Sequence, residues 1–232
     1  MVGISIACTK EWECVLERFG LSSEDCGQYP FGEYFKKELY GEEVIIYKCG
    51  SKKANSSAAA QYMIDHFQLP KIIVAGTCAG IDPDYNTLDI MFPDRLVQYD
   101  CNIPGFGKII KDSLSVYIDT DSHKDLKTGT IGTADKPVVL WSDYNTLKYN
   151  GITVADTESA AIAYVCRANG VECVVVKGIS DYPEEVIGPE DTDLIMEQYN
   201  TFVANIPIIM NDIFDNYLEY ALKNRFNWKS HS

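Results

Sequence analysis

The sequence predicts a single-domain α/β protein in which a twisted, mixed but largely parallel β-sheet is flanked by helices. Short β-branched runs alternate with longer stretches of helical periodicity, which is the pattern of such a fold. No internal repeat and no Pro/Ser-rich linker divides the 232 residues. The composition, 46% hydrophobic and 23% charged, suits a chain that buries a large core. Residues 1–232 are therefore expected to form one domain.

Seven apolar runs predict the strands. They are residues 2–8, 43–49, 71–76, 88–97, 129–133, 152–156 and 172–179. Runs that are apolar throughout, such as 172–179, are typical of strands buried on both faces of a sheet. Residues 104–122 are the least regular part of the chain, and we expect them to be a partly ordered excursion near the strand ends.

Four stretches predict helices between or after these strands. Residues 9–19 predict a helix with Thr9 as its N-cap, and residues 55–67 predict a second. Residues 158–169, rich in alanine, predict a third helix followed by Gly170 in the C′ position. The C-terminal stretch repeats apolar side chains at three- and four-residue spacing, which predicts a long amphipathic helix docked on the sheet: Ile206, Ile209, Ile213, Tyr217 and Tyr220.

The charge of the chain narrows the class of partner. Asp and Glu number 34 against 20 Lys and Arg, a formal net charge of −14, so nucleic acid and anionic membrane surfaces are poor partners. No stretch approaches the roughly 18 to 20 consecutive apolar residues of a membrane span, and no basic segment precedes the first strand. The sequence predicts a cytoplasmic protein that acts on a small molecule, without nucleic acid or membrane.

Cysteine and histidine give no sign of a metal or redox site. No two of the eight cysteines have CxxC spacing, and reduced, buried thiols are expected in a chain of this size. The three histidines are scattered, which argues against a histidine triad or metal cluster. The GxGxxG, GxxxxGK[ST] and GxSxG motifs are absent as well. We expect neither a metal nor an organic cofactor.

Three carboxyl groups stand where a ligand site would form in an α/β sheet. Glu11, Glu158 and Asp181 each occupy the end of an apolar strand or the first turn of the helix after it, and ligands favour the carboxyl ends of strands. Structural explanations exist for each: a cap or turn for Asp181, and compensation of the helix dipole for Glu11 and Glu158. The small residues Gly76-Thr77-Cys78-Ala79-Gly80 fit either a tight βα turn or a close approach to a ligand.

Taken in chain order, these segments resemble the purine and uridine phosphorylase superfamily, and most closely its branch of 5′-methylthioadenosine/S-adenosylhomocysteine nucleosidases. The resemblance runs from residue 2 to about residue 215. It rests on Ala7-Cys8-Thr9-Lys10-Glu11, Gly76-Thr77-Cys78-Ala79-Gly80, Asp156-Thr157-Glu158-Ser159-Ala160-Ala161 and Val176-Lys177-Gly178-Ile179-Ser180-Asp181. It implies a nucleoside phosphorylase-like fold, a nucleoside substrate, no cofactor, and a homodimer or larger homo-oligomer.

The resemblance also implies roles for the three acids. Asp181, held by Ser180, would protonate purine N7 as the N-glycosidic bond breaks, and Glu11 would be the general base for a water on the opposite face of the sugar. Glu158 would accept hydrogen bonds from the ribose 2′- and 3′-hydroxyls. The same resemblance assigns further substrate contacts to Ser51, Cys78, Ala79, Gly80, Pro137, Val138, Asp156, Thr157 and Ser180.

Hydrolysis by water and phosphorolysis differ in whether the site binds phosphate. The chain has four arginines, and none lies in the glycine-rich segment or in residues 48–53, which correspond to a phosphate-binding loop in the phosphorylases. Lys52 and Lys53 leave phosphate binding open. A purine nucleosidase is the first hypothesis; a purine nucleoside phosphorylase and a non-catalytic nucleoside-binding or storage protein are the alternatives.

Some positions depart from the nucleosidase pattern and bear on the substrate. Pro137 and Val138 occupy the stretch where the nucleosidases carry a Phe that stacks on adenine, so Trp141 or another ring has to replace it. Thr157 replaces a Met beneath the ribose, and Ser51 replaces an apolar residue near the 5′-substituent. The 5′-group is therefore left open, and adenine is predicted as the base because a carboxyl at Asp181 suits purine N7.

Overall fold

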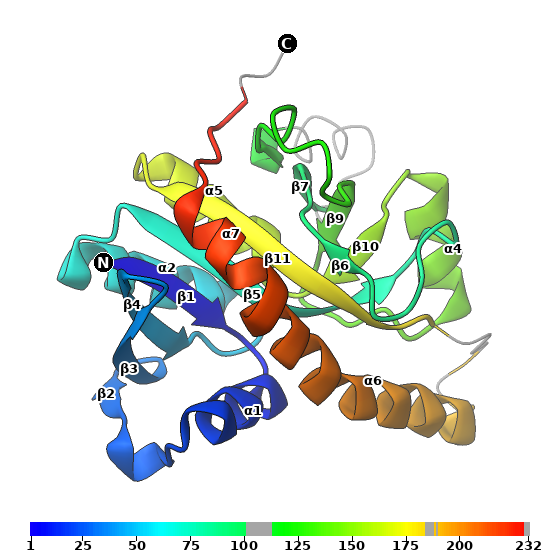
Figure 1. Ribbon diagram of the computed structural model, residues 1–232. Coiled ribbons are helices and arrows are strands. Elements are labelled where there is room, and N and C mark those ends of the chain that lie inside the picture. The colour runs from blue at the N-terminus through cyan, green and yellow to red at the C-terminus, as the bar shows by residue number, and fades with distance from the viewer. Residues whose placement is uncertain (101–112, 184–187, 189, 230–232) are drawn as a thin grey trace.

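Eleven strands form one mixed sheet with helices on both of its faces (Figure 1) in the computed structural model, which describes residues 1–100, 113–183, 188 and 190–229. The strands are β1 (Val2–Ile6), β2 (Gly27–Tyr29), β3 (Gly32–Leu39), β4 (Glu42–Lys48), β5 (Lys71–Gly80), β6 (Ile90–Met91), β7 (Arg95–Gln98), β8 (Val116–Tyr117), β9 (Thr130–Thr133), β10 (Val154–Asp156) and β11 (Glu172–Asp181). The predicted α/β class with a mixed sheet is confirmed.

Two parallel groups of strands meet at the end of β5. In the first group β4, β1, β5 and β11 run parallel to one another. In the second group β10, β9 and β7 are parallel. The groups are joined where Ala79 and Gly80, the last residues of β5, pair antiparallel with Ala155 and Val154 of β10. This junction brings the ends of β5, β10 and β11 together.

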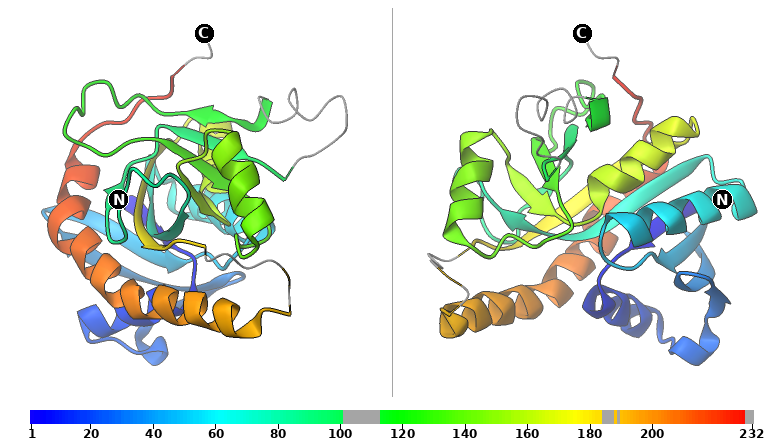
Figure 2. Two further views of the ribbon diagram at one scale, coloured as in Figure 1. Left: turned by 90° about the vertical axis from the view of Figure 1, so that its right-hand side faces the viewer. Right: turned by 180° about the vertical axis from the view of Figure 1, so that it is seen from behind.

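The helices cover both faces of the sheet (Figure 2). They are α1 (Thr9–Phe19), α2 (Lys53–Phe67), α4 (Trp141–Tyr149), α5 (Ser159–Ala168), α6 (Thr192–Asp212) and α7 (Leu218–Lys223), with a short 3₁₀ turn, η1 (Ser23–Asp25), and a π-helical turn, η2 (Ile213–Tyr217), that joins α6 to α7. Helices α6 and α7 cross in front of β11, whereas α2 and α5 lie behind the sheet (Figures 1 and 2).

The predicted docking of the C-terminal helix on the sheet is confirmed. Ile206 and Ile209 of α6 are each 1% exposed, and Ile213 is fully buried. The contact is close because Gly178 of β11 has no side chain: a Cβ added there would lie 2.2 Å from Cγ2 of Ile209. The helix that carries these isoleucines is therefore held firmly against the strand that ends at Asp181.

Three local predictions are wrong. The run at residues 88–97 is two strands, because Pro93 lacks an N–H for a sheet hydrogen bond, and β6 then pairs with β11 while β7 pairs with β9. The small residues from Gly76 to Gly80 belong to β5 and do not form a turn. The N-cap of α1 is Cys8, not Thr9.

Elements with weak apolar patterns were not predicted. Strands β2 and β3 form a hairpin that pairs with β4 at the edge of the sheet, where Lys36, Lys37 and Glu38 are exposed. Charged edge strands are common because they prevent pairing with other chains. Within the stretch 104–122, residues 104–112 lie outside the described part of the chain, and β8 follows at Val116–Tyr117.

Candidate active site

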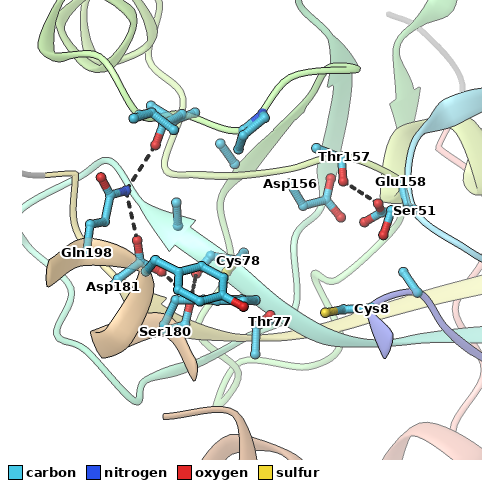
Figure 3. A pocket seen from close by; sticks show the side chains of 18 of the residues that line it. Cys8, Ser51, Thr77, Cys78, Asp156, Thr157, Glu158, Ser180, Asp181 and Gln198 are labelled. Carbon is cyan, nitrogen blue, oxygen red and sulfur yellow. Dashed lines mark hydrogen bonds between the residues drawn. The ribbon is translucent and has the colours of Figure 1, made fainter. Parts of the chain in front are cut away.

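One cavity of about 380 Å³ opens at the carboxyl ends of β1, β5, β10 and β11. The three acids that the sequence singled out, Glu11, Glu158 and Asp181, all line it, so side chains far apart in the sequence meet at one place. Figure 3 shows Ser180, Asp181 and Gln198 on one side of the cavity and Asp156, Thr157 and Glu158 on the other. The cavity therefore has two chemically distinct ends, separated by its open volume.

Glu11 is held by the end of β5. Its Oε1 accepts hydrogen bonds from the backbone N–H of Thr77 (2.6 Å) and from the Thr77 hydroxyl (2.7 Å), and its Oε2 accepts one from the Cys8 N–H (3.0 Å). The side chain is 2% exposed. These contacts need Gly76, because a Cβ there would lie 2.7 Å from Oε1 of Glu11. The strand thus fixes the carboxylate at the cavity wall.

Glu158 caps the start of α5 at the opposite end of the cavity from Asp181 (Figure 3). Its Oε1 accepts hydrogen bonds from the Lys52 N–H (2.9 Å) and from the Thr157 hydroxyl. Burial, followed by repulsion from Asp156, raises the pKa of Glu158 to about 7. A carboxyl with this pKa changes its charge readily when hydroxyl donors of a ligand approach.

A buried lysine balances part of this negative charge. Lys177 of β11 is 1% exposed, and its Nζ lies 3.3 Å from Oδ2 of Asp156. Burial alone would lower the pKa of Lys177, but attraction to Asp156, Glu11 and Glu158 outweighs it, so that the pKa is raised above its usual range and the ammonium stays charged. Asp156 also accepts hydrogen bonds from Thr133 (2.6 Å) and from the backbone N–H of Ser159 (3.1 Å), so Lys177 and α5 hold it in place together.

The raised pKa of Glu158 predicts that ionising this group destabilises the fold. Between pH 4.5 and about 7 the folded state holds a proton that the unfolded state has lost, so stability falls as pH rises through this window. Glu158→Gln, which carries no charge, is therefore expected to be about 3 kcal/mol more stable than the parent at pH 8 and equally stable near pH 4.

Thermal unfolding at the two pH values measures this difference. The matched control is Glu24→Gln, which removes an exposed carboxylate and should leave the difference between the two pH values unchanged. A Glu158→Gln protein that melts at the parent's temperature at pH 8 would contradict the argument.

Asp181 lies at the end of β11 in a network of hydrogen bonds. Its Oδ1 lies 2.5 Å from the Ser180 hydroxyl, which lies in turn 3.1 Å from the carbonyl oxygen of Cys78. Its Oδ2 accepts a hydrogen bond from Nε2 of Gln198 (3.1 Å). Burial raises the pKa of Asp181, against the lowering effect of the Ser180 and Gln198 donors. The carboxyl thus keeps a proton to higher pH than an exposed aspartate does.

Most of the residues predicted for the substrate site line the cavity. They are Ser51, Cys78, Ala79, Pro137, Val138, Asp156, Thr157 and Ser180, with the three acids. Gly80 is the exception: it does not line the cavity, and a Cβ there would lie 2.3 Å from the ring of Tyr182. The glycine therefore makes room for that ring.

Helix α6 supplies residues that the sequence did not single out. Ile195, Gln198, Tyr199 and Phe202 line the cavity, and their spacing of three and four residues places them on one face of the helix. The same spacing identified the docking face from Ile206 onward, so the signal was present in the sequence. Trp141, a candidate for the missing aromatic partner of a base, stacks instead on Tyr144 at 4.6 Å and does not line the cavity.

The described wall of the cavity carries acidic side chains and no basic ones. Among the described lining residues are four carboxyl side chains, those of Glu11, Asp156, Glu158 and Asp181, and no lysine or arginine. Lys53 is a candidate phosphate ligand by its position in the sequence, but its Nζ donates a hydrogen bond to Oδ1 of Asp100 (2.6 Å). An anion entering the cavity would therefore meet no unpaired cation along the described wall.

Other kinds of site are not found in the part of the chain that the structure describes. No group of three or more His, Cys, Asp or Glu side chains is placed to hold a metal ion there. In the same residues, no helix is long and apolar enough to cross a membrane. The seven cysteines within the described ranges are all free thiols, and Cys101 lies outside those ranges.

Comparison with known proteins finds relatives in the phosphorylase superfamily, several of them named as nucleosidases. A sequence model of the phosphorylase superfamily matches residues 17–215. An aminodeoxyfutalosine nucleosidase from Helicobacter pylori is 26% identical over 91% of this chain and 99% of its own length. A 5′-methylthioadenosine/S-adenosylhomocysteine nucleosidase from Tolumonas auensis is 26% identical over 77% of this chain and 85% of its own length.

Solved structures share the fold. A Helicobacter pylori MTAN mutant with 5′-methylthioadenosine in its active site superposes with a TM-score of 0.68 at 23% identity, over 91% of this chain and 97% of that chain. A Francisella philomiragia protein proposed to be a 5′-methylthioadenosine/S-adenosylhomocysteine nucleosidase has a TM-score of 0.77 at 19% identity, over 96% of this chain and 99% of that chain. The arrangement of strands and helices is therefore shared along nearly the whole chain.

Proposed function

The chain belongs to the phosphorylase superfamily, and from this premise we propose that it is a nucleosidase, which hydrolyses the N-glycosidic bond of an adenosine-type purine nucleoside to free base and a ribose derivative. The observation that carries the proposal is the acidic cavity, in which four carboxyls surround a space of about 380 Å³ and no cation lines the described wall. A single catalytic domain, residues 1–232, performs the reaction.

Asp181 is the general acid. A purine anion is a poor leaving group, so the base must receive a proton as the bond to the sugar stretches. Burial raises the pKa of Asp181, which favours the protonated form needed for this step. When the proton of Asp181 is on Oδ1, it is donated to the Ser180 oxygen, and the Ser180 hydroxyl then donates to the Cys78 carbonyl oxygen. When the proton is on Oδ2, it can be transferred to N7 of the base.

Glu11 is the general base. The bond breaks through a sugar with oxocarbenium character, and a water must then attack C1′ from the face opposite the base. Oε2 of Glu11 accepts one hydrogen bond, from the Cys8 N–H, and has a second lone pair for a water. The bonds from Thr77 keep the carboxylate from turning away, so the water is held at a fixed position.

Glu158 binds the sugar. It lies at the end of the cavity away from Asp181, where the ribose follows if the base lies beside Asp181 (Figure 3). Two ribose hydroxyls donating to Glu158 favour its ionised form, so binding shifts a carboxyl whose pKa is about 7 towards the charged state. The negative charge then stabilises the cationic sugar in the transition state.

Water is favoured over phosphate as the nucleophile by the charges of the wall. Phosphorolysis needs cations that hold a dianion beside C1′, usually arginine or lysine. The buried ammonium of Lys177 lies close to the cavity but is paired with Asp156. The described wall of the cavity offers no lysine or arginine side chain in its place.

A substrate panel tests the function. The protein would be incubated with plain adenosine and with the three compounds for which the similar nucleosidases are named, each with and without phosphate. These are 5′-methylthioadenosine, S-adenosylhomocysteine and aminodeoxyfutalosine. We expect release of base and free sugar at the same rate in both buffers. A sugar 1-phosphate product, or a rate that rises with phosphate, would establish phosphorolysis, and release of no base from any of them would overturn the proposed activity.

Two further observations support a proposed assembly and location. Free thiols at seven cysteines suit a reducing compartment, which supports the cytoplasm. Met196 and Tyr199 lie three residues apart on one face of α6 and are each half exposed, and an exposed apolar patch on a helix favours a protein interface. The chain therefore works in the cytoplasm as a homodimer or a larger homo-oligomer.

A further inference from the structure

Gln198 connects the proposed general acid to another wall of the cavity. The side chain extends from α6 and is 8% exposed. Its Nε2 lies 3.1 Å from Oδ2 of Asp181 and 3.1 Å from the carbonyl oxygen of Val138 (Figure 3). Both hydrogens of the amide group are therefore used, one on each acceptor.

The orientation of this amide is fixed by Val138. A backbone carbonyl only accepts hydrogen bonds, so the amide must turn its NH₂ group towards it, and the second hydrogen is then directed at Asp181. The opposite orientation would place Oε1 of Gln198 against the Val138 oxygen. In the orientation found, Oε1 is buried without a hydrogen-bond partner, so the two donor contacts compensate for an unsatisfied acceptor.

The position of Gln198 matters for the base because of how a purine is built. Atom N7 and the substituent at position 6 lie side by side on one edge of the ring. A 6-oxopurine presents two acceptors there, whereas adenine presents an acceptor at N7 and a donor at the 6-amino group. This step rests on the proposed function: if Asp181 donates to N7, its neighbour Gln198 lies beside position 6.

We propose that Gln198 reads position 6 of the base and adapts the site to 6-oxopurine nucleosides alongside adenosine-type ones. The protonated Asp181 and the NH₂ group of Gln198 form a pair of adjacent donors, which matches N7 and O6 of a 6-oxopurine. The Gln198 hydrogen that Oδ2 of Asp181 accepts is then shared with O6 as a bifurcated donor, and Val138 keeps the other hydrogen. A 6-amino group is itself a donor, so it competes with the NH₂ group of Gln198 for Oδ2 of Asp181 and the Val138 carbonyl oxygen.

The test compares two substrates that differ only at position 6, 5′-methylthioinosine and 5′-methylthioadenosine. We expect the parent to cleave both. In Gln198→Leu, which has no donor, losing the bond to Asp181 affects both substrates alike, so the measure is the ratio of kcat/KM for the inosine compound to kcat/KM for the adenosine compound; this ratio should fall by about tenfold or more. The matched control is Asn200→Leu, an exposed position on the same helix, which should leave both values unchanged.

The outcomes separate this inference from the proposed function. A parent that cleaves only the adenosine compound, or a Gln198→Leu protein that loses activity equally on both, overturns the role of Gln198 and leaves the nucleosidase activity standing. A parent that cleaves neither compound nor any other nucleoside overturns the proposed function and the inference with it. Gln198→Met serves as a second variant, and thermal unfolding confirms that each variant is folded before its ratio of kcat/KM values is compared.

Discussion

Asp181→Asn is expected to lower kcat by about 10²–10⁴-fold while KM changes little, because the amide keeps the shape of the side chain and cannot release a proton to the base. The remaining rate comes from binding and from the other carboxyls. The asparagine can still bond to Ser180 and Gln198, so the fold should be retained.

The pH dependence of kcat/KM provides a second test of the role of Asp181. A general acid must be protonated, so kcat/KM of the parent falls as pH rises through the pKa of Asp181, which burial has raised. In Asp181→Asn this alkaline decline should disappear. Asp84→Asn, at an exposed position, is the control and should keep both the rate and the decline. An Asp181→Asn protein with the parent's kcat would remove the carboxyl from the mechanism.

Glu11→Gln is expected to have a similarly large effect, a fall in kcat of about 10²–10⁴-fold, because an amide cannot take a proton from the attacking water. The amide oxygen can still accept from Thr77, but the amide nitrogen then faces the Cys8 N–H, and two donors cannot pair. A loss of stability of about 1 kcal/mol should therefore accompany the loss of rate.

Two variants separate these effects for Glu11. Glu13→Gln removes an exposed carboxylate two residues along the same helix and should change neither kcat nor the melting temperature appreciably. Glu11→Asp keeps the charge but withdraws it by one methylene, so its rate should fall while a base remains present. Rates for Glu11→Gln close to those of the parent would assign the activation of water to another group.

Apolar pattern was enough to predict the parts of the fold that bury strands on both faces. The runs at residues 2–8, 71–76 and 172–179 correspond to β1, β5 and β11, and the acids that follow such runs reach the same cavity. Edge strands and partly exposed helices give no such signal. β3, in which the successive residues Lys36, Lys37 and Glu38 are all exposed, was missed for that reason.

The rest of the site depends on contacts between elements that no local pattern contains. Gln198 is an ordinary polar residue in the sequence. Its contact with Asp181 depends on α6 crossing the end of β11, which no local pattern predicts. Lys177 reads as one charge in an apolar run, and the sequence does not reveal that Asp156 would pair with it. Gly80 was predicted to contact the ligand, but its lack of a side chain makes room for the ring of Tyr182.

The lack of basic side chains along the described wall of the cavity also has a consequence for phosphorylated adenine compounds. Nucleotides such as AMP carry a 5′-phosphate, and burying that dianion in a cavity whose described wall has no lysine or arginine side chain, with the nearby ammonium of Lys177 already paired with Asp156, is unfavourable. A nucleosidase with this wall would thereby discriminate against phosphorylated nucleosides by charge.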